Sequence, residues 1–252
     1  MKAFVINLKS NPERRSFMAG QLERLGIEYE FVEAIVGLER CGDPRWNAPE
    51  RSRREISREL RPGEVGCALS HAAVYDEIVS RGLPWAFILE DDATLHEDVP
   101  LVLRKLEEGV LEQGDIVFLE RCDYVRPFSS RVLWGRYRIA APIFVTLGSV
   151  AQAAGYVVTN EAARRMQGVN VPAHLPADNW YMYDGLVRFR GITPTLTLIR
   201  QRVSFGSTTL DGKTRPEFRR HNLLLMLAYG FFMFTRPGKA LRRALKKRGL
   251  MR

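Results

Sequence analysis

The stretch Trp85-Ala86-Phe87-Ile88-Leu89 runs directly into Glu90-Asp91-Asp92. A short run of apolar residues without polar interruption is typical of a strand buried on both faces, as in the centre of a parallel sheet. Ligands of such sheets bind beyond the carboxyl ends of the strands, where the loops converge. The stretch therefore predicts an α/β fold, and it places three acidic residues where a ligand is expected.

Strand and helix patterns alternate along the rest of the chain. Residues 3–8 form an apolar run, after which Asn11-Pro12-Glu13 supplies a cap, a first-turn proline and a first-turn acid for a helix that Gly26 ends. Residues 38–61 hold many charges and little periodicity, and we interpret them as a mobile or irregular loop. This alternation predicts a largely parallel or mixed sheet with helices on both faces. Further strands are expected at 29–35, 116–119 and 155–159, and further helices at 64–82, at 99–110 and from 161 onward, the last capped by Asn160.

The formal net charge of +9 is concentrated in the carboxyl-terminal part of the chain. Residues 215–252 hold eleven Lys or Arg and one acid, whereas residues 1–214 hold 27 basic and 28 acidic residues. A basic end and a pI of about 9.7 are common in nucleic-acid-binding proteins, which are the rival interpretation from another class. The near-neutral body and the single apolar cluster of aromatics in the tail argue against it, so we expect no nucleic-acid partner.

Three cysteines, Cys41, Cys67 and Cys122, are odd in number and widely spaced. That spacing indicates neither a disulfide framework nor a zinc site, and a reducing compartment fits it best. Cys67 is expected to pack as a small apolar residue. The apolar run 3–6 is too short for a signal peptide, so we expect the protein to stay in the cytoplasm.

The acidic triplet has the chemistry of a metal site. If the chain stays extended, Glu90 and Asp92 point to one side about 7 Å apart, which leaves Asp91 to orient a neighbour. Mg²⁺ and Mn²⁺ prefer oxygen ligands and fill their remaining positions with water and substrate phosphates. We therefore expect Glu90 and Asp92 to hold a divalent metal ion, either Mn²⁺ or Mg²⁺. The alternative is an acidic cluster that caps the next helix.

Six ordered segments resemble the glycosyltransferase family 25 enzymes of bacterial lipooligosaccharide and lipopolysaccharide synthesis. The most recognisable is GEVGCALSH at 63–71, and the acidic segment ILEDD follows at 88–92. The resemblance spans about residues 3–205, and six ordered matches arise by chance far less often than one short motif. The other four segments are residues 5–8 with 13–15, residues 33–37, residues 155–159 and residues 176–178.

The resemblance implies a GT-A fold, in which a Rossmann-like nucleotide-binding half merges with an acceptor-binding half. It implies an inverting transfer, with galactose from UDP-galactose as the commonest precedent, to lipooligosaccharide, lipopolysaccharide or another surface-glycan or lipid-linked acceptor. We expect the catalytic domain to cover residues 1–214 and a basic, apolar, helical tail to cover residues 215–252. A non-catalytic protein that binds nucleotide sugars is the second alternative.

Inversion by direct displacement requires a base near the acceptor hydroxyl. Asp178 is the first candidate, because Asn179-Trp180 places it in a loop with an aromatic neighbour that can stack on a sugar, although it can instead cap the following helix. Glu120 is the second candidate, because it ends an apolar strand as the acidic triplet does. Weaker candidates are Asp123 and Asp184.

The remaining expected substrate contacts come from the same segments. Arg14 and Arg15 can bind the diphosphate or the uridine ribose through forked hydrogen bonds, or can lie solvated at a helix start. Ser70 and His71 are expected to contact nucleotide or acceptor, with structural hydrogen bonding as the alternative, and Glu64 is either a contact or a first-turn helix acid. The full set of expected substrate-binding residues is Asn7, Arg14, Arg15, Glu64, Ser70, His71, Asp91 and Asn179.

The composition of the tail indicates binding to a membrane surface. Residues 223–234 are apolar apart from Tyr229 and Gly230, and this stretch is well short of the roughly 20 residues needed to cross a bilayer. Cations flank it on both sides, an arrangement that suits the interface of an anionic membrane, where each Lys or Arg adds about 1 kcal/mol. We expect residues 219–252 to dock peripherally on the inner face of a bacterial inner membrane. A buried C-terminal helix is the alternative.

Overall fold

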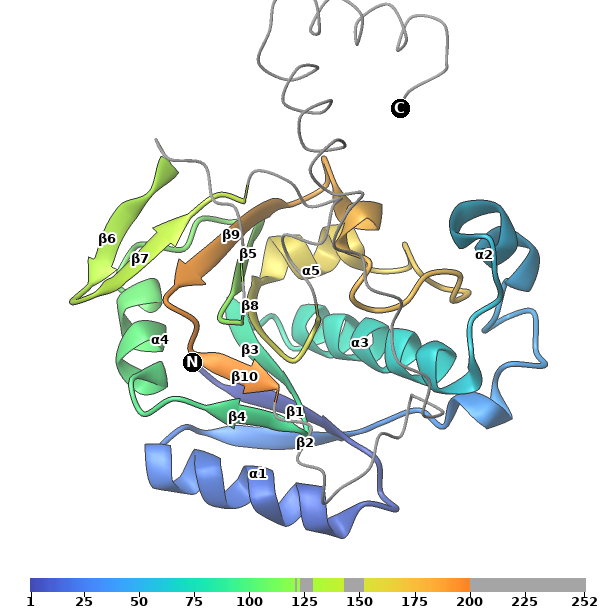
Figure 1. The fold of residues 1–252 in the computed structure, drawn as a ribbon, viewed down its shortest axis with the longest axis horizontal. Coiled ribbons are helices and arrows are strands. Elements are labelled where there is room, and N and C mark those ends of the chain that lie inside the picture. Colours follow the sequence, from blue (N-terminus) through green and yellow to red (C-terminus); the bar gives the residue numbers. More distant parts are fainter. Residues whose placement is uncertain (121, 123–128, 143–151, 200–252) are drawn as a thin grey trace, which may run out of the picture. The chain divides into compact units, whose positions relative to one another are not determined.

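The computed structural model describes residues 1–120, 122, 129–142 and 152–199. Its centre is an eight-stranded mixed sheet in the order β2-β1-β3-β8-β5-β9-β7-β6 (Figure 1). β1 pairs in parallel with β2 and β3, β5 pairs in parallel with β9, and β8 lies antiparallel between β3 and β5. The strands are β1 Ala3–Asn7, β2 Tyr29–Glu33, β3 Trp85–Glu90, β5 Asp115–Phe118, β6 Arg131–Trp134, β7 Tyr137–Ala140, β8 Gly155–Thr159 and β9 Arg188–Thr193, while β4 Ala93–Leu95 and β10 Thr197–Ile199 pair in a separate two-stranded sheet.

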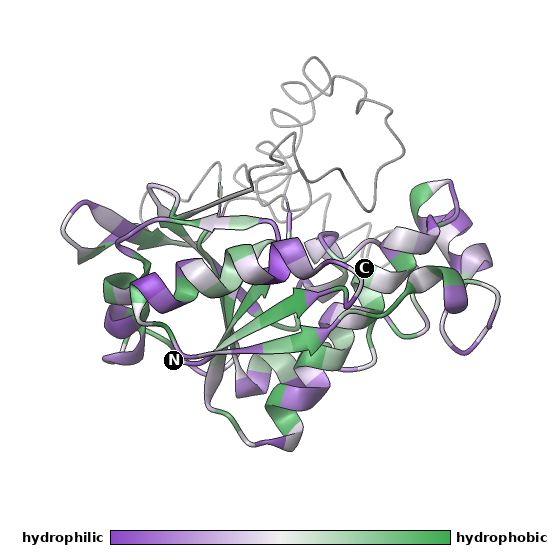
Figure 2. Cartoon of the chain, turned by 90° about the horizontal axis from the view of Figure 1, so that it is seen from below, coloured by the Kyte–Doolittle hydropathy of each residue, from purple (hydrophilic) through white to green (hydrophobic). Residues whose placement is uncertain are grey.

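Helices cover both faces of the main sheet. One apolar cluster joins the strands to α1 and α4, and another joins them to α3 and α5. Figure 2 shows the apolar strands lying between these helices, whose outer faces carry hydrophilic residues. The predicted α/β class, with a mixed sheet and flanking helices, is confirmed, whereas the expected helical tail lies outside the described residues. The helices are α1 Pro12–Leu25, α2 Pro49–Ile56, α3 Pro62–Ser80, α4 Val99–Glu107 and α5 Asn160–Met166, with short 3₁₀ helices at Gly37–Glu39 and Trp180–Tyr183.

The central strands divide their side chains between the two clusters. Along β3, Phe87 and Leu89 join the cluster under α1 and α4, whereas Ala86 and Ile88 join the one under α3 and α5. All four are fully buried, as the period of two requires for a strand covered on both sides. The three large side chains, Phe87, Ile88 and Leu89, each contribute roughly 1.5–3 kcal/mol when they are buried, so the run that ends at Glu90 is well anchored in the core.

The ends of α1 follow the sequence signals. Asn11 Oδ1 accepts a hydrogen bond from the backbone N–H of Arg14, and Pro12 stands at the first helical position. Gly26 adopts a left-handed conformation with φ of 63° and ends the helix. The prediction for α5 was wrong by one residue, because Thr159 rather than Asn160 caps it. The Thr159 hydroxyl accepts from the N–H of Ala162.

Residues 38–61 are not the irregular loop that the sequence suggested. They contain the 3₁₀ turn at Gly37–Glu39 and the helix α2 Pro49–Ile56. Pro49 begins α2 at a position where a missing N–H has no cost, and ion pairs such as Arg51 with Glu55 line its exposed side. Ser52 is the buried residue of this helix, so α2 shows no apolar period from which it could be predicted.

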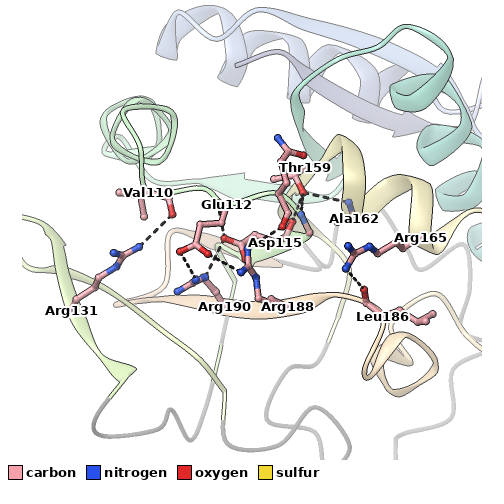
Figure 3. A network of polar contacts seen from close by, with 12 residues as sticks. Val110, Glu112, Asp115, Arg131, Thr159, Ala162, Arg165, Leu186, Arg188 and Arg190 are labelled. Carbon is pink, nitrogen blue, oxygen red and sulfur yellow. Dashed lines mark hydrogen bonds and ion pairs between the residues drawn. The ribbon is translucent and has the colours of Figure 1, made fainter.

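A polar network fixes the start of β5 against β9 (Figure 3). The Asp115 carboxylate is fully buried and accepts from Arg188 Nε at 2.9 Å and from Arg190 Nε at 3.2 Å. Thr159 Oγ1 donates to the carbonyl oxygen of Asp115 at 3.2 Å, which ties β8 to the same point. This network lies at the amino end of β5, whereas Glu120 follows its carboxyl end.

Candidate active site

The parallel register brings three strand ends to one edge of the sheet. Asn7, the last residue of β1, pairs with Glu33, the last residue of β2, and Ile6 pairs with Glu90, the last residue of β3. A cavity of about 360 Å³ opens beyond this edge, as expected for a sheet of this kind. Its walls are the ends of β1 and β3, Arg14 of α1, the segment 34–38, the first turns of α3, and the acidic triplet.

Asp91 is held by two neighbours. Asn7 Nδ2 donates to its Oδ2 at 2.8 Å, and Arg14 Nη1 donates to its Oδ1 at 2.8 Å. All three residues are buried. Arg14 and Asp91 line the cavity, and Asn7 does not, but Asn7 and Arg14 together support the acidic turn. The expected contacts of Asn7, Arg14 and Asp91 with substrate stay predictions.

Glu90 and Asp92 both line the cavity. Burial first, and then the charge of Glu90, raise the pKa of Asp92 from 3.8 to about 6, while Arg14, 3.6 Å away, opposes the shift. Asp92 Oδ1 is buried and makes no hydrogen bond within the described residues. Two carboxylates that repel one another, one with an unpaired oxygen, form a donor set suited to a hard divalent cation.

Cys67 and His71 join the site from α3. His71 Nε2 lies 3.3 Å from Glu90 Oε1, and Cys67 Sγ lies 3.7 Å from the same oxygen. Burial of the thiol first, and then the charges of Glu90 and Asp178, raise the pKa of Cys67 well above its usual range. The expectation that Cys67 merely packs as an apolar residue missed this contact. The signal was present, because residues four apart on a helix share one face.

Ser70 and Glu64 make structural contacts. Ser70 is buried, donates to the carbonyl oxygen of Gly66 at 2.7 Å, and accepts from the backbone N–H of Ile35 at 2.8 Å, although it also borders the cavity. Glu64 accepts from the N–H of Arg61 at the start of α3 and from both terminal nitrogens of Arg58. These contacts correspond to the structural alternatives for both residues, and their contact with substrate stays a prediction.

Arg15 faces a different part of the surface. Its guanidinium lies 4.0 Å from the centre of the Phe31 ring, and it borders a second, smaller pocket with Lys9 and Glu33. The side chains of the two neighbouring arginines therefore lie in different places. Arg14 borders the main cavity, and Arg15 does not line it.

Glu120 and Asp178 lie within electrostatic reach of the triplet. Burial first, and then the charges of Glu90 and Asp178, raise the pKa of Glu120 well above its usual range, while nearby backbone amides of residues 154 and 155 oppose the shift. Asp178 lies in a turn before the 3₁₀ helix Trp180–Tyr183, which Asn179 precedes. The side chain of Asn179 makes no capping hydrogen bond there. Asp123 lies outside the described residues.

Residues 215–252, with the segment 219–252 expected to dock on a membrane, lie outside the described residues. Across the ranges that the structure does describe, no helix is both long enough and apolar enough to span a bilayer.

Comparison with known proteins identifies the family of this chain. The family described as "Glycosyltransferase family 25 (LPS biosynthesis protein)" matches residues 1–181. "Inactive glycosyltransferase 25 family member 3" of Mus musculus is 29% identical over 194 residues, which cover 71% of this chain and 31% of the relative. "Procollagen galactosyltransferase 2" of Mus musculus is 36% identical over 112 residues, which cover 42% of this chain and 18% of the relative.

The chain spans about a third or less of the length of these relatives. Among solved structures, mouse xyloside xylosyltransferase 1 in its apo form aligns over 73% of this chain and 68% of that chain, with a TM-score of 0.35 and 11% identity. The family match covers most of the chain and includes the segments 5–8, 63–71, 88–92 and 176–178. The resemblance read from these segments is confirmed, and the chain belongs to glycosyltransferase family 25.

Proposed function

We propose that this protein is an inverting glycosyltransferase that transfers one hexose to a surface-glycan acceptor. The first candidate for the donor is UDP-galactose, which supplies galactose. The observation that carries the proposal is the cavity at the carboxyl ends of β1 and β3, bordered by Glu90, Asp91 and Asp92. Its family membership and the galactosyltransferase named among its relatives support the choice of reaction.

Glu90 and Asp92 would hold the divalent metal ion, Mn²⁺ or Mg²⁺. Their mutual repulsion and the unpaired Oδ1 of Asp92 support this assignment, since a cation between them relieves both. When bound, the ion supplies positive charge that neutralises the diphosphate leaving group. Asn7 and Arg14 contribute by fixing Asp91, so the turn that carries both ligands keeps its shape.

Asp178 remains the first candidate for the base that accepts the proton of the acceptor hydroxyl. Its charge raises the pKa of both Cys67 and Glu120, which supports a position beside the triplet. Glu120 is buried, and this burial raises its pKa well above the usual range, which favours the neutral form of its carboxyl group. A carboxyl group has to be ionised before it can act as a base, and burial of Glu120 opposes its ionisation, so Glu120 is the second candidate.

We also propose that the acceptor is lipid-linked, as in lipooligosaccharide or lipopolysaccharide synthesis, and that the enzyme works at the inner face of a bacterial inner membrane. The cations and the apolar segment within 219–252 support this location. Deleting 219–252 should release the protein from anionic liposomes and spare transfer to a short soluble acceptor. Sedimentation of the truncated protein with the liposomes would refute the docking.

The reaction is tested by screening nucleotide sugars for metal-dependent thermal stabilisation and hydrolysis. UDP-galactose at a hundredfold excess over its Kd should stabilise the wild type by about 2.7 kcal/mol in the presence of Mn²⁺. Asp92→Ala should lose the metal-dependent part, and the exposed control Glu28→Ala should retain it. If no nucleotide sugar binds with any divalent metal, the proposed reaction is wrong.

A second candidate function is non-catalytic binding of a nucleotide sugar. The observation that favours it is the name of a relative, which describes that protein as inactive. The same screen distinguishes the two functions. A binder without activity is stabilised by UDP-galactose but shows neither hydrolysis nor transfer with any acceptor tried.

A further inference from the structure

Three side chains of different chemistry converge on one point at the cavity wall. The thiol of Cys67, the imidazole of His71 and the carboxylate of Glu90 each offer one ligand atom, and these three atoms lie within 4.8 Å of one another. All three residues border the cavity. Asp92, the other expected metal ligand, does not belong to this group. The group therefore shares Glu90 with the pair of carboxylates assigned to Mn²⁺ or Mg²⁺ but differs from it in its other two ligands.

The spacing of the three atoms fits one tetrahedral ion. Zinc binds nitrogen at about 2.0–2.1 Å, sulfur at about 2.3 Å and carboxylate oxygen at about 2.0–2.2 Å, which separates neighbouring ligands by about 3.3–3.6 Å. Nε2 of His71 lies 3.3 Å from Oε1 of Glu90, and Sγ of Cys67 lies 3.7 Å from that oxygen. The remaining pair, Sγ of Cys67 and Nε2 of His71, lies within 4.8 Å, so rotation of these two side chains has to bring them closer around a cation.

A buried partner already fixes the other side of the imidazole. His71 Nδ1 lies 2.8 Å from the hydroxyl of Tyr156, which in turn lies 2.8 Å from the hydroxyl of Tyr75. If Nδ1 carries the proton and donates it to Tyr156, the lone pair of Nε2 faces Glu90 and Cys67. Histidines that bind metals are oriented in this way by a second hydrogen bond.

The ligand types decide which cation fits. Thiolate and imidazole favour Zn²⁺ and similar borderline-soft ions, whereas Mg²⁺ and Mn²⁺ prefer oxygen. Binding displaces the Cys67 thiol proton to solvent, so that a thiolate, a neutral imidazole and a carboxylate surround the ion. Three protein ligands beside a cavity leave the fourth position of a tetrahedral ion open, as in zinc sites that bind water or substrate.

We propose that Cys67, His71 and Glu90 form a binding site for a thiophilic divalent cation, Zn²⁺ foremost, whose fourth position opens to the cavity. The site shares Glu90 with the proposed Mn²⁺ or Mg²⁺ pair, but it requires neither Asp92 nor a nucleotide sugar, so it can be tested separately from the proposed transfer reaction. It also gives Glu90 a second role, because its Oε1 is directed at Cys67 and His71.

Cobalt provides a direct probe, because Co²⁺ replaces Zn²⁺ and a cobalt–thiolate bond absorbs in the near ultraviolet. The full-length protein, treated with chelator and then titrated with Co²⁺, should develop this charge-transfer band together with the visible bands of tetrahedral cobalt. Zn²⁺ should abolish both at one equivalent per chain. Cys67→Ser should lose the charge-transfer band, and the matched control Cys41→Ser should keep it.

Tyr156→Phe tests the orientation of His71. It removes the hydroxyl partner of Nδ1 and should weaken Zn²⁺ binding about 10–100-fold, while Tyr183→Phe, a change of the same kind at a neighbouring buried tyrosine, should leave the affinity unchanged. A merely structural role of Tyr156 would lower the melting temperature of the metal-free protein without this selective loss.

The proposal is overturned if the wild type develops no thiolate band with Co²⁺, or if Cys67→Ser keeps the band. A measurement on the wild type alone guards against a variant that fails to fold. Zn²⁺ should protect Cys67, but not Cys41, from alkylation followed by mass spectrometry, and equal modification of Cys67 with and without Zn²⁺ under conditions where it reacts would also overturn the site. Asp92→Ala should bind Zn²⁺ as the wild type does, which separates this test from that of the transfer reaction.

Discussion

Arg14 and Asp91 form a buried ion pair, with 2.8 Å between Nη1 and Oδ1 and side-chain exposures of 6% and 11%. The pair joins the first turn of α1 to the turn after β3. Asn7 Nδ2 holds the second oxygen of Asp91, so the carboxylate is fixed from two sides. The position of the acidic triplet thus depends on contacts between segments that are 77 and 84 residues apart in sequence.

Replacing Arg14 by leucine should destabilise the protein strongly. Loss of one member of a buried ion pair leaves an uncompensated charge and typically costs about 3–5 kcal/mol. Urea denaturation of Arg14→Leu should show a loss of this size, whereas Arg15→Leu, at an exposed position against Phe31, should cost less than about 1 kcal/mol. Equal losses in the two variants would show that Asp91 does not depend on Arg14.

The sequence predicted those parts of the fold whose signals are local. Asn11, Pro12 and Gly26 mark the ends of α1 within a few residues, and the apolar run of β3 needs no distant partner to be recognised. The helix α2 was not predicted, because its stability depends on surface ion pairs rather than on an apolar period. It also depends on contacts of the loop around it, such as the bridge between Asn47 and Ala173.

The candidate site shows the same division. The triplet predicted that Glu90 and Asp92 lie where a ligand is expected, and both line the cavity, but the neighbours of each residue could not be predicted from it. Whether Arg14 faces a substrate or Asp91 depends on how α1 lies against β3, which no local pattern encodes. The Cys67–His71 pair could in principle be predicted from its helical spacing, yet the third member, Glu90, comes from the strand β3.

Gly66 forms part of the cavity wall because backbone meets backbone there. A Cβ atom at this position would lie 2.4 Å from the carbonyl oxygen of Ile35 and 2.7 Å from the N–H nitrogen of Gly37. Gly66→Ala should therefore push α3 from the segment 34–38 and cost about 1–3 kcal/mol in chemical denaturation.

Gly20→Ala is the matched control for Gly66. Gly20 lies within α1, and a Cβ atom there meets no other atom within 4 Å. Because alanine favours helix over glycine, this variant should gain about 0.5–1 kcal/mol. A Gly66→Ala protein as stable as the wild type would show that the two backbone segments have room to separate.

The stability of the protein should fall in acid partly through Glu64. Burial alone would raise the pKa of Glu64, but the hydrogen bonds from Arg58 and from the N–H of Arg61 outweigh it and leave the pKa below its usual value. A carboxyl group whose pKa is lower in the folded state contributes stability above its unfolded pKa of about 4.3 and loses it as the pH falls through the folded value.

Glu64→Gln should therefore flatten the pH dependence of unfolding below about pH 5 relative to the wild type. The substitution keeps the length of the side chain and its capping acceptor while it removes the charge. The measurement is the free energy of unfolding between neutral and acid pH, with Glu28→Gln, at an exposed position, as the control. Parallel curves for the wild type and Glu64→Gln would contradict the assignment.

Asp178 and Glu120 can be separated by their effects on transfer and on donor binding. Asp178→Asn should lower kcat about 10²–10⁴-fold, the usual contribution of a general base, while the affinity for UDP-galactose with Mn²⁺ stays nearly unchanged. Glu120→Gln mimics the protonated carboxyl that burial favours and should retain more activity. Asp76→Asn, at an exposed position on α3, serves as the control. Transfer that survives in Asp178→Asn but not in Glu120→Gln would reverse the assignment, because the proton would then pass to the buried carboxylate.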